Sequence, residues 1–347
     1  MDPSVYIPAY LERAYVASHP ELTDAARELV HNDISANPHK YAQTEHAQAL
    51  LSYAGVHRHL LDELHRIEDM GSDEEFEQTR NRLFDDMRDE LLKIVRVDAL
   101  AVDAQLLAII LADTPVDACL GDLMKLEATT ADYLQQSVPG FDMEAPHYWA
   151  NKVLTDGVTA ADLTVSEPAL IGWLHTLEAI SQLCMASARY RAAANYSRRV
   201  LKAEGYPTRA AGTVLLALAR LEDEDGFFAL AHQLEEQMGA DVLEDSPWYL
   251  LARTILLFKT NKMRPATRAL REFANRCEGG AFFLLNPMYQ TPYLPCRPEP
   301  HDPWDLSHQA VWEADGIISD TPDFAPWANA CEDVSQLAQE FARRYGF

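Results

Sequence analysis

The chain has 347 residues and carries 29 Lys and Arg against 54 Asp and Glu, a formal charge of −25. Hydrophobic residues make up 48 % of the sequence and charged residues 24 %, an ordinary globular composition rather than a disordered one. This acidity excludes a protein that binds nucleic acid by neutralising phosphates, because such binding needs a basic face.

The sequence also predicts a compartment. The first residues, MDPSVYIPAYLERAY, contain no basic region followed by an apolar one, so we expect no secretory signal. The most apolar window, Leu106–Ala112, is far shorter than the roughly twenty residues of a membrane span. The five cysteines lie far apart and form no CxxC pair, which is typical of reduced thiols. We therefore expect a cytoplasmic protein that does not bind membranes.

Composition and periodicity favour an all-α fold. The chain is rich in Ala and Leu and has only 14 Gly. After Ser72, which has Glu75 at capping-box spacing, apolar residues recur three, four or seven positions apart on one helix face. No segment shows the sustained alternation of a strand.

In chain order, we expect helices at residues 41–69, 73–97, 100–112, 115–137, 143–155, 168–187, 190–204, 208–222, 226–239, 246–260, 264–277, 304–318 and 325–345. Gly and Pro residues such as Gly71, Pro115, Gly140, Pro207 and Gly239 separate these segments and end helices. The short turns predict antiparallel hairpins. Ala193, Ala229 and Ala266 lie 36 and 37 residues apart, a period typical of stacked helix pairs.

One segment carries a family resemblance. Trp248, Leu251 and Ala252, followed by Ala266, resemble a tetratricopeptide (TPR) repeat, and residues 73–137 and 168–277 resemble TPR-like units. The resemblance implies an α-α superhelix, a TPR-like solenoid of antiparallel helix pairs whose first helices line a concave peptide-binding groove.

The C-terminal third shows a second, looser similarity. The order of Asn286-Pro287, Tyr293-Leu294-Pro295, Gln309–Trp312 and Ala325-Pro326-Trp327 is similar to bacterial TPR proteins related to the suppression-of-tumorigenicity family. That similarity implies a helical-repeat fold without an assigned chemistry. We expect three regions: an N-terminal helical region with degenerate hairpins (1–157), TPR-like hairpins (158–285), and a Pro-rich wrap with C-terminal capping helices (286–347).

Candidate metal and catalytic residues cluster near the N-terminus. His46, His57 and His65 share a face of the expected helix 41–69, and Asp62 precedes His65 at ligand spacing. The three turns between the first two histidines span about 16 Å, too far for one ion. The chain has no GxSxG, HExxH, GxxxxGK[ST] or GxGxxG motif. We therefore predict no catalytic, cofactor or metal residue; the alternative is an enzyme or metal protein that uses these His- and acid-rich helices.

Two basic segments stand out in the acidic chain. Residues 188–202 and 259–276 supply a candidate basic stripe: Arg189, Arg191, Arg198, Lys262, Arg264 and Arg271. One interpretation is internal pairing with the surplus acids, and the other is binding of an acidic peptide or an anionic surface. The acidic run 61–90 has the same two kinds of interpretation, a solvated face or a docking surface for a basic partner.

The TPR resemblance predicts a binding groove. If Trp248 packs inward, Tyr249 and Arg253 point into the groove, and the same counting adds Glu178. The Pro-rich segment 287–303 should run extended along the solenoid, and a sharper hypothesis puts it in the groove as an internal ligand. The predicted function is a non-enzymatic adaptor or scaffold for a protein or peptide.

Overall fold

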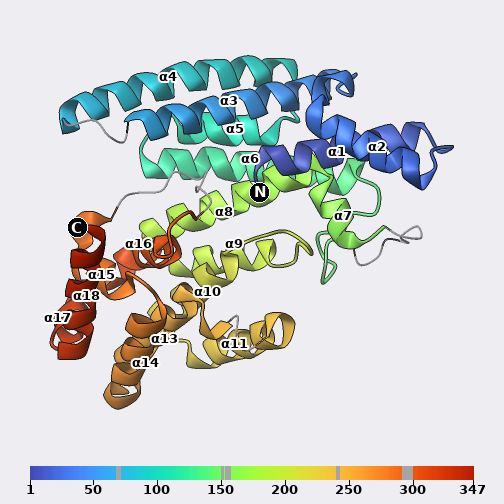
Figure 1. Ribbon diagram of the computed structural model, residues 1–347. Coiled ribbons are helices and arrows are strands. Elements are labelled where there is room, and N and C mark those ends of the chain that lie inside the picture. The colour runs from blue at the N-terminus through green and yellow to red at the C-terminus, as the bar shows by residue number, and fades with distance from the viewer. Residues whose placement is uncertain (68–71, 150–151, 153–157, 240–242, 291–299) are drawn as a thin grey trace. The chain divides into compact units, whose positions relative to one another are not determined.

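The computed structural model describes residues 1–67, 72–149, 152, 158–239, 243–290 and 300–347. These residues form α-helices and two short 3-10 turns, with no strand among them, so the prediction of an all-α protein is confirmed (Figure 1). The chain divides into two compact units. The first comprises Met1–Ala179 and Lys202–Pro207, and the second comprises Ile180–Leu201 and Thr208–Phe347.

The acidity is concentrated in the first unit. Of the 54 Asp and Glu of the chain, 33 belong to this unit, whereas only 13 of the 29 Lys and Arg do. The second unit therefore has 21 acidic and 16 basic residues, a net charge of −5 compared with −20 for the first unit. Residues 1–157 all lie in the first unit, residues 286–347 all lie in the second, and residues 158–285 contribute to both.

The first unit is a stack of helices. Its elements are α1 (Pro3–Ser18), α2 (Asp24–Ala36), η1 (Pro38–Lys40), α3 (Glu45–Ile67), α4 (Asp73–Val97), α5 (Val102–Ile110), α6 (Val116–Ser137), α7 (Ala160–Val165) and the first part of α8 (Pro168–Ala186). Helices α3 to α6 pack consecutively (Figure 1). Helix α4 has the predicted bounds because the Ser72 hydroxyl accepts the Glu75 amide and caps its first turn.

Helix α1 was not expected from the sequence. It begins because Asp2 accepts the Ser4 amide at the N-cap and Pro3 occupies the first helical position. It buries Tyr6, Ile7 and Leu11 and contacts α2, α3 and α7. Pro8 lies inside the helix, and this proline masks the helical signal in the sequence.

The expected helix over 143–155 is wrong in its described part. Residues 143–149 form turns and bends instead. Pro146 lies within this stretch and opposes a helix there. The flanking aromatic rings pack inward: Tyr148 lies with its ring centroid 5.3 Å from that of Phe141 and 5.3 Å from that of Trp173. Aromatic burial, not helical periodicity, therefore shapes this segment.

The second unit contains the rest of α8, then α9 (Tyr190–Val200), α10 (Ala210–Arg220), α11 (Glu224–Met238), α13 (Pro247–Lys259), α14 (Met263–Arg276), α15 (Gly280–Leu285), η2 (Pro287–Tyr289), α16 (Asp305–Ser319), α17 (Phe324–Asn329) and α18 (Glu332–Tyr345). The single helix expected over 325–345 is two helices, α17 and α18, because the chain turns at Ala330 and Cys331. The hypothesis that segment 287–303 fills a groove depends on residues 291–299, which lie outside the described residues.

Three hairpins of the second unit share one turn. Ala188, Glu222 and Asn261 each occupy the middle of a three-residue turn with φ of 59°, 59° and 60°. Such values are uncommon for residues other than glycine. In each turn the next amide reaches the carbonyl five residues back: Arg189 to Cys184 (2.7 Å), Asp223 to Leu218 (3.1 Å) and Lys262 to Leu257 (2.9 Å). This Schellman geometry, repeated three times, indicates one structural unit used three times.

The turns correct the register expected for the repeat. Five residues after each turn centre stand Ala193, Phe227 and Ala266, all fully buried. Ala229, the expected middle mark, is exposed, so that assignment was wrong. The spacing is therefore 34 and 39 residues. Phe227 hides the repeat in the sequence because a large residue stands where its counterparts are small.

Candidate functional site

The residues predicted to bind a peptide make internal contacts. Tyr249 is half-buried and stacks on Phe227 of α11, with ring centroids 6.0 Å apart. Arg253 donates to Glu272 of α14 at 2.9 Å. The side chains of Tyr249 and Arg253 thus contact α11 and α14, the second helices of two hairpins. Glu178 belongs to the first unit, where its carboxylate accepts the Tyr206 hydroxyl at 2.8 Å. Peptide binding by these residues stays a prediction.

Helix α16 covers another face of α10 and α13. Its Glu313 is only 7 % exposed and accepts hydrogen bonds from Trp248 Nε1, at 2.8 Å, and from the Thr213 hydroxyl. One turn earlier, Gln309 accepts from Arg209. The face of α10 and α13 that carries Thr213 and Trp248 is thus filled by a helix of the same chain and is not open to a partner.

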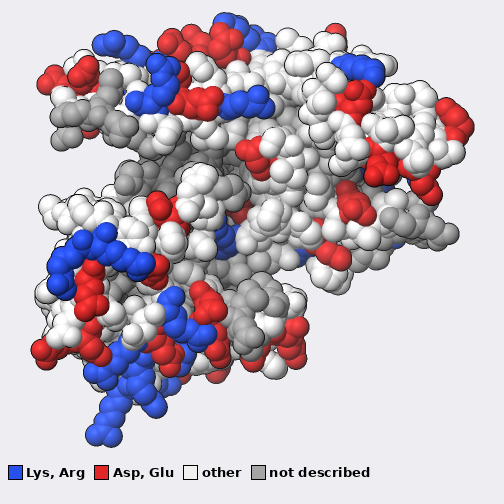
Figure 2. Space-filling model, viewed as in Figure 1, with Lys and Arg blue, Asp and Glu red and all other residues white. Residues whose placement is uncertain are grey.

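Internal pairing accounts for part of the basic stripe. Lys262 pairs with Glu224, and Arg271 pairs with Asp333 at 2.6 Å. Arg189 donates to the Ser187 hydroxyl at 3.2 Å. Arg191, Arg198 and Arg264 are exposed, and the described residues offer them no ion pair. Figure 2 shows blue side chains gathered over α14 at the bottom of the view. An acidic partner for these arginines stays a prediction.

The second unit contains an open groove of about 590 Å³ between α15, α17 and α18. These three helices contact one another and lie side by side at the red end of the chain (Figure 1). The described residues that line the groove are Phe282, Leu285, Asn286, Ala325, Pro326, Asn329, Ser335, Ala338, Gln339 and Ala342. None of these residues is charged.

Helical spacing brings the lining residues together. On α18, Ser335, Ala338, Gln339 and Ala342 follow one another at intervals of three, one and three residues, so they form one stripe. Ala338 is buried at the floor, whereas Gln339 is exposed at the rim. The small side chains keep the groove open, since a larger residue at either alanine would fill it.

An aromatic cluster supports one wall of the groove. The Phe282 ring packs against Phe341 at 5.2 Å and against Phe347 at 5.0 Å, and it also contacts Tyr289 at 5.2 Å. Beside this cluster Met288 is 83 % exposed. Sequence patterns do not reveal this site because its residues come from three helices and include no motif. The four-residue spacing of Ala338 and Ala342 was the available signal.

Hydrogen bonds join three ionisable side chains of the first unit. Tyr6 of α1 donates to Asp103 of α5 at 2.6 Å, and the other oxygen of Asp103 lies 2.8 Å from Nδ1 of His175 on α8. Burial raises the pKa of Asp103, but the charge of His175 and the hydrogen bonds from His175 and Tyr6 outweigh burial and hold that pKa below its usual value. Burial and the Asp103 charge raise the pKa of Tyr6 well above its usual value. These hydrogen bonds connect α1 to α5 and α5 to α8.

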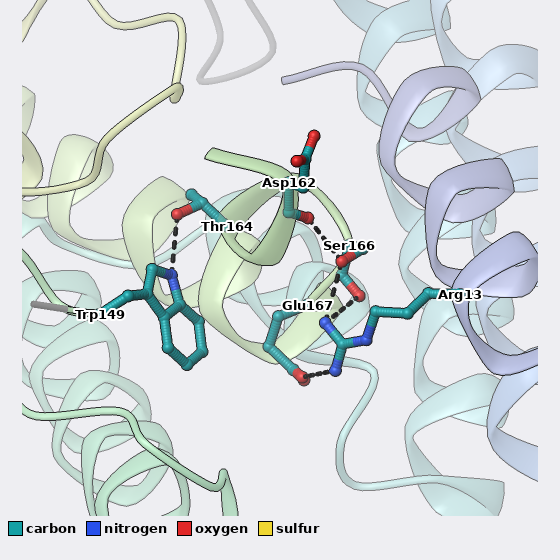
Figure 3. Close-up of polar contacts among 6 residues, drawn as sticks. All are labelled: Arg13, Trp149, Asp162, Thr164, Ser166 and Glu167. Atoms are coloured by element: carbon teal, nitrogen blue, oxygen red, sulfur yellow. Dashed lines mark hydrogen bonds and ion pairs between the residues drawn. The ribbon is translucent and has the colours of Figure 1, made fainter. Parts of the chain in front are cut away.

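A second polar cluster anchors α1 near the start of α8 (Figure 3). Arg13 Nη1 donates to the Ser166 hydroxyl at 2.9 Å and to its carbonyl oxygen at 3.3 Å, and Nη2 pairs with Glu167 at 3.2 Å. Burial raises the pKa of Glu167 despite the opposing attraction of Arg13. The ion pair with Arg13 therefore offsets only part of the free-energy cost of burying the Glu167 carboxylate.

The same view shows how α7 is held. Trp149 Nε1 donates to the Thr164 hydroxyl at 2.9 Å, and the Ser166 hydroxyl donates to the Asp162 carbonyl at 2.6 Å (Figure 3). These bonds fix the short helix between the irregular segment and α8. The residues drawn in Figure 3 thus connect α1, α7 and the start of α8 within the first unit.

The N-terminal histidines considered as metal ligands have different surroundings. His46 Nδ1 is 2.5 Å from Asp98, whereas His57 is buried, and burial lowers the pKa of His57. Among the residues described, no group of three or more His, Cys, Asp or Glu is placed to hold a metal ion. The pairs Asp98–His46 and Asp103–His175 have the composition of acid–base pairs. An enzymatic role for these helices stays an alternative prediction.

No family model, curated protein or solved structure matches this chain. None of the helices that the structure describes is both long and apolar enough to cross a membrane.

Proposed function

We propose that this chain is a non-enzymatic protein-binding scaffold that holds its partner in the groove between α15, α17 and α18. The observation that carries the proposal is the uncharged lining. In a chain with 24 % charged residues, about two of ten lining residues would be charged, and none of those described is. Depletion of charge distinguishes the centre of a protein interface from the rest of a surface.

The surroundings of the groove support this function. Exposed Met288, Tyr289 and Phe347 lie with or beside the Phe282 ring that forms one wall. Methionine and aromatic side chains are enriched at protein interfaces, where flexible thioethers and rigid rings supply contact area.

The rest of the second unit packs against the helices that form the groove. Three hairpins with the same turn stack next to the groove-forming helices, and α14 contacts α18 directly. The Arg271–Asp333 pair joins those two helices at their surface. The described cysteines Cys119, Cys184, Cys277 and Cys331 are free thiols, which supports a scaffold that works in the reducing cytoplasm.

Site-specific crosslinking in the native cells tests this proposal. A photoreactive amino acid is placed at Gln339, at the groove rim, and separately at Gln336, exposed on the same helix but outside the lining. We expect a protein that crosslinks from position 339 and not from 336. That protein, once purified, should bind Gln339→Glu at least tenfold more weakly than Gln336→Glu, because only the first change puts a charge in the interface. Equal crosslinking from both positions, or equal affinity of both variants, would overturn the proposal.

A further inference from the structure

The geometry points to one class of occupant for the groove: we propose that it takes an amphipathic α-helix of a partner protein, with large aliphatic side chains and no charge on the docked face. This inference rests on the proposed function and adds the conformation and chemistry of the partner. Three properties of the groove carry it: its dimensions, its supply of hydrogen-bond partners, and the size of its lining side chains.

The dimensions fit half of a helix. The lining stripe of α18 runs from Ser335 to Ala342, which corresponds to about 10.5 Å at 1.5 Å per residue. A volume of about 590 Å³ over that length gives a mean cross-section of about 55 Å². A helix with its side chains is about 10–12 Å wide, or about 80–110 Å² in section. The groove thus holds roughly one half of a helix over two turns and leaves the other half in water.

Hydrogen-bond supply separates a helix from an extended peptide. An extended segment brings an unpaired N–H and C=O at every residue, and each costs free energy when it is buried without a partner. The described lining offers only Asn286, Asn329, Ser335 and Gln339 as polar side chains. Three of these already form hydrogen bonds within the chain, since Asn286 donates to the Phe282 carbonyl and the Ser335 hydroxyl donates to Asn329. A helix needs no such partners because its backbone groups bond to each other.

The lining side chains select what the helix presents. Ala325, Ala338 and Ala342 are small and leave room for side chains of the partner rather than filling the groove themselves. Large aliphatic residues spaced at i, i+3 or i+4, and i+7 would occupy that room over two turns. A charged residue on this face would lose its hydration without an ionic partner, since no described lining residue is charged. Proline-rich peptides dock on aromatic-lined grooves, and here Phe282 is the one aromatic among the described lining residues.

Selection from a random library of 16-residue peptides displayed on phage tests the inference with the full chain. Peptides are selected on the wild type and on Gln336→Glu, and peptides that also bind Gln339→Glu are removed. The survivors are synthesised and their affinities are measured. We expect apolar residues at i, i+3 or i+4, and i+7, a loss of more than tenfold in affinity when a central residue is replaced by proline, and induced helicity in circular dichroism on binding.

The outcomes separate this inference from the proposed function. Groove-dependent peptides that alternate apolar and polar residues, or that tolerate central proline, would overturn the helical occupant and leave the groove as a binding site. If no peptide distinguishes Gln339→Glu from Gln336→Glu, both the inference and the proposed function are wrong. Ala342→Leu supplies an uncharged check: it fills the groove and should weaken groove-dependent peptides as Gln339→Glu does.

Discussion

Gly212 of α10 controls how closely α13 packs against it. A Cβ atom at position 212 would lie 2.5 Å from Cδ1 and 2.7 Å from Cβ of Trp248. Carbon atoms in contact normally lie about 3.5–4.0 Å apart, so one helix must shift. The indole has little freedom to move, because it is buried and its N–H donates to the buried Glu313. Gly212→Ala should therefore destabilise the second unit although alanine favours helices.

The magnitude follows from opposing contributions. Overpacking a core costs about 1–3 kcal/mol, and weakening a hydrogen bond to a buried carboxylate adds about 1.5–3 kcal/mol if the indole shifts. Alanine returns at most about 1 kcal/mol of helix propensity. These contributions give an expected net loss of about 1.5–5 kcal/mol, or at least about 3 °C in Tm for a unit of this size.

Gly55 of α3 provides the matched control. It is also inside a helix, but a Cβ there would meet nothing within 4 Å. Gly55→Ala should raise stability by about 0.5–1 kcal/mol. Thermal unfolding followed by circular dichroism measures both variants, and hydrogen exchange locates the loss along the chain, where we expect it in α10 and α13. A Gly212→Ala variant as stable as the wild type would refute the close approach of these helices.

Three further predictions address single side chains. Trp248→Phe removes a hydrogen-bond donor to Glu313 and should lower the free energy of unfolding in urea by about 1.5–3 kcal/mol. Glu313→Gln should lower it less in the Trp248→Phe background than in the wild type. Additive effects of the two changes would contradict the contact. Burial lowers the pKa of His57, so the stability that neutral His57 gives the fold is complete above about pH 6.5 and is lost as the pH falls through the folded-state pKa. Between about pH 7.5 and pH 5 the Tm of His57→Gln should therefore fall less than that of the wild type, whereas the Tm of exposed His59→Gln should follow the wild type. Parallel Tm curves for both variants would refute this prediction. Burial raises the pKa of Cys277 to about 12, so mass-spectrometric labelling with iodoacetamide at about pH 8 should modify Cys277 at least tenfold more slowly than Cys331, and equal rates would show that Cys277 is accessible.

The sequence predicts most of the helices because their determinants are local. Ser72 caps α4, and apolar periodicity then carries that helix to its predicted end. The errors occur where distant contacts decide. Tyr148 and its aromatic neighbours hold residues 143–149 in an irregular path, and their packing partner Trp173 lies on a helix that follows later in the chain. The helix α1 depends on a cap and on burial of Tyr6 against α5, which compensate for an internal proline.

The candidate site was less predictable than the fold. Tyr249 and Arg253 lie one turn apart on α13, as helical spacing requires, but the sequence does not show that α16 covers one face of that helix or that Glu272 pairs with Arg253. The groove depends on which small residues from three helices meet. Ala338 and Ala342 have the spacing of an ordinary helix face, and only the structure places them opposite α15 and α17.

Hydrogen exchange of the full chain, with and without a groove-dependent helical peptide, shows which helices the peptide contacts. We expect slower exchange of the amides in α17 and α18 and no change in α10 or α13. Slower exchange confined to α10 and α13, or to the arginine-bearing surface of α14, would contradict this expectation and place the binding site elsewhere.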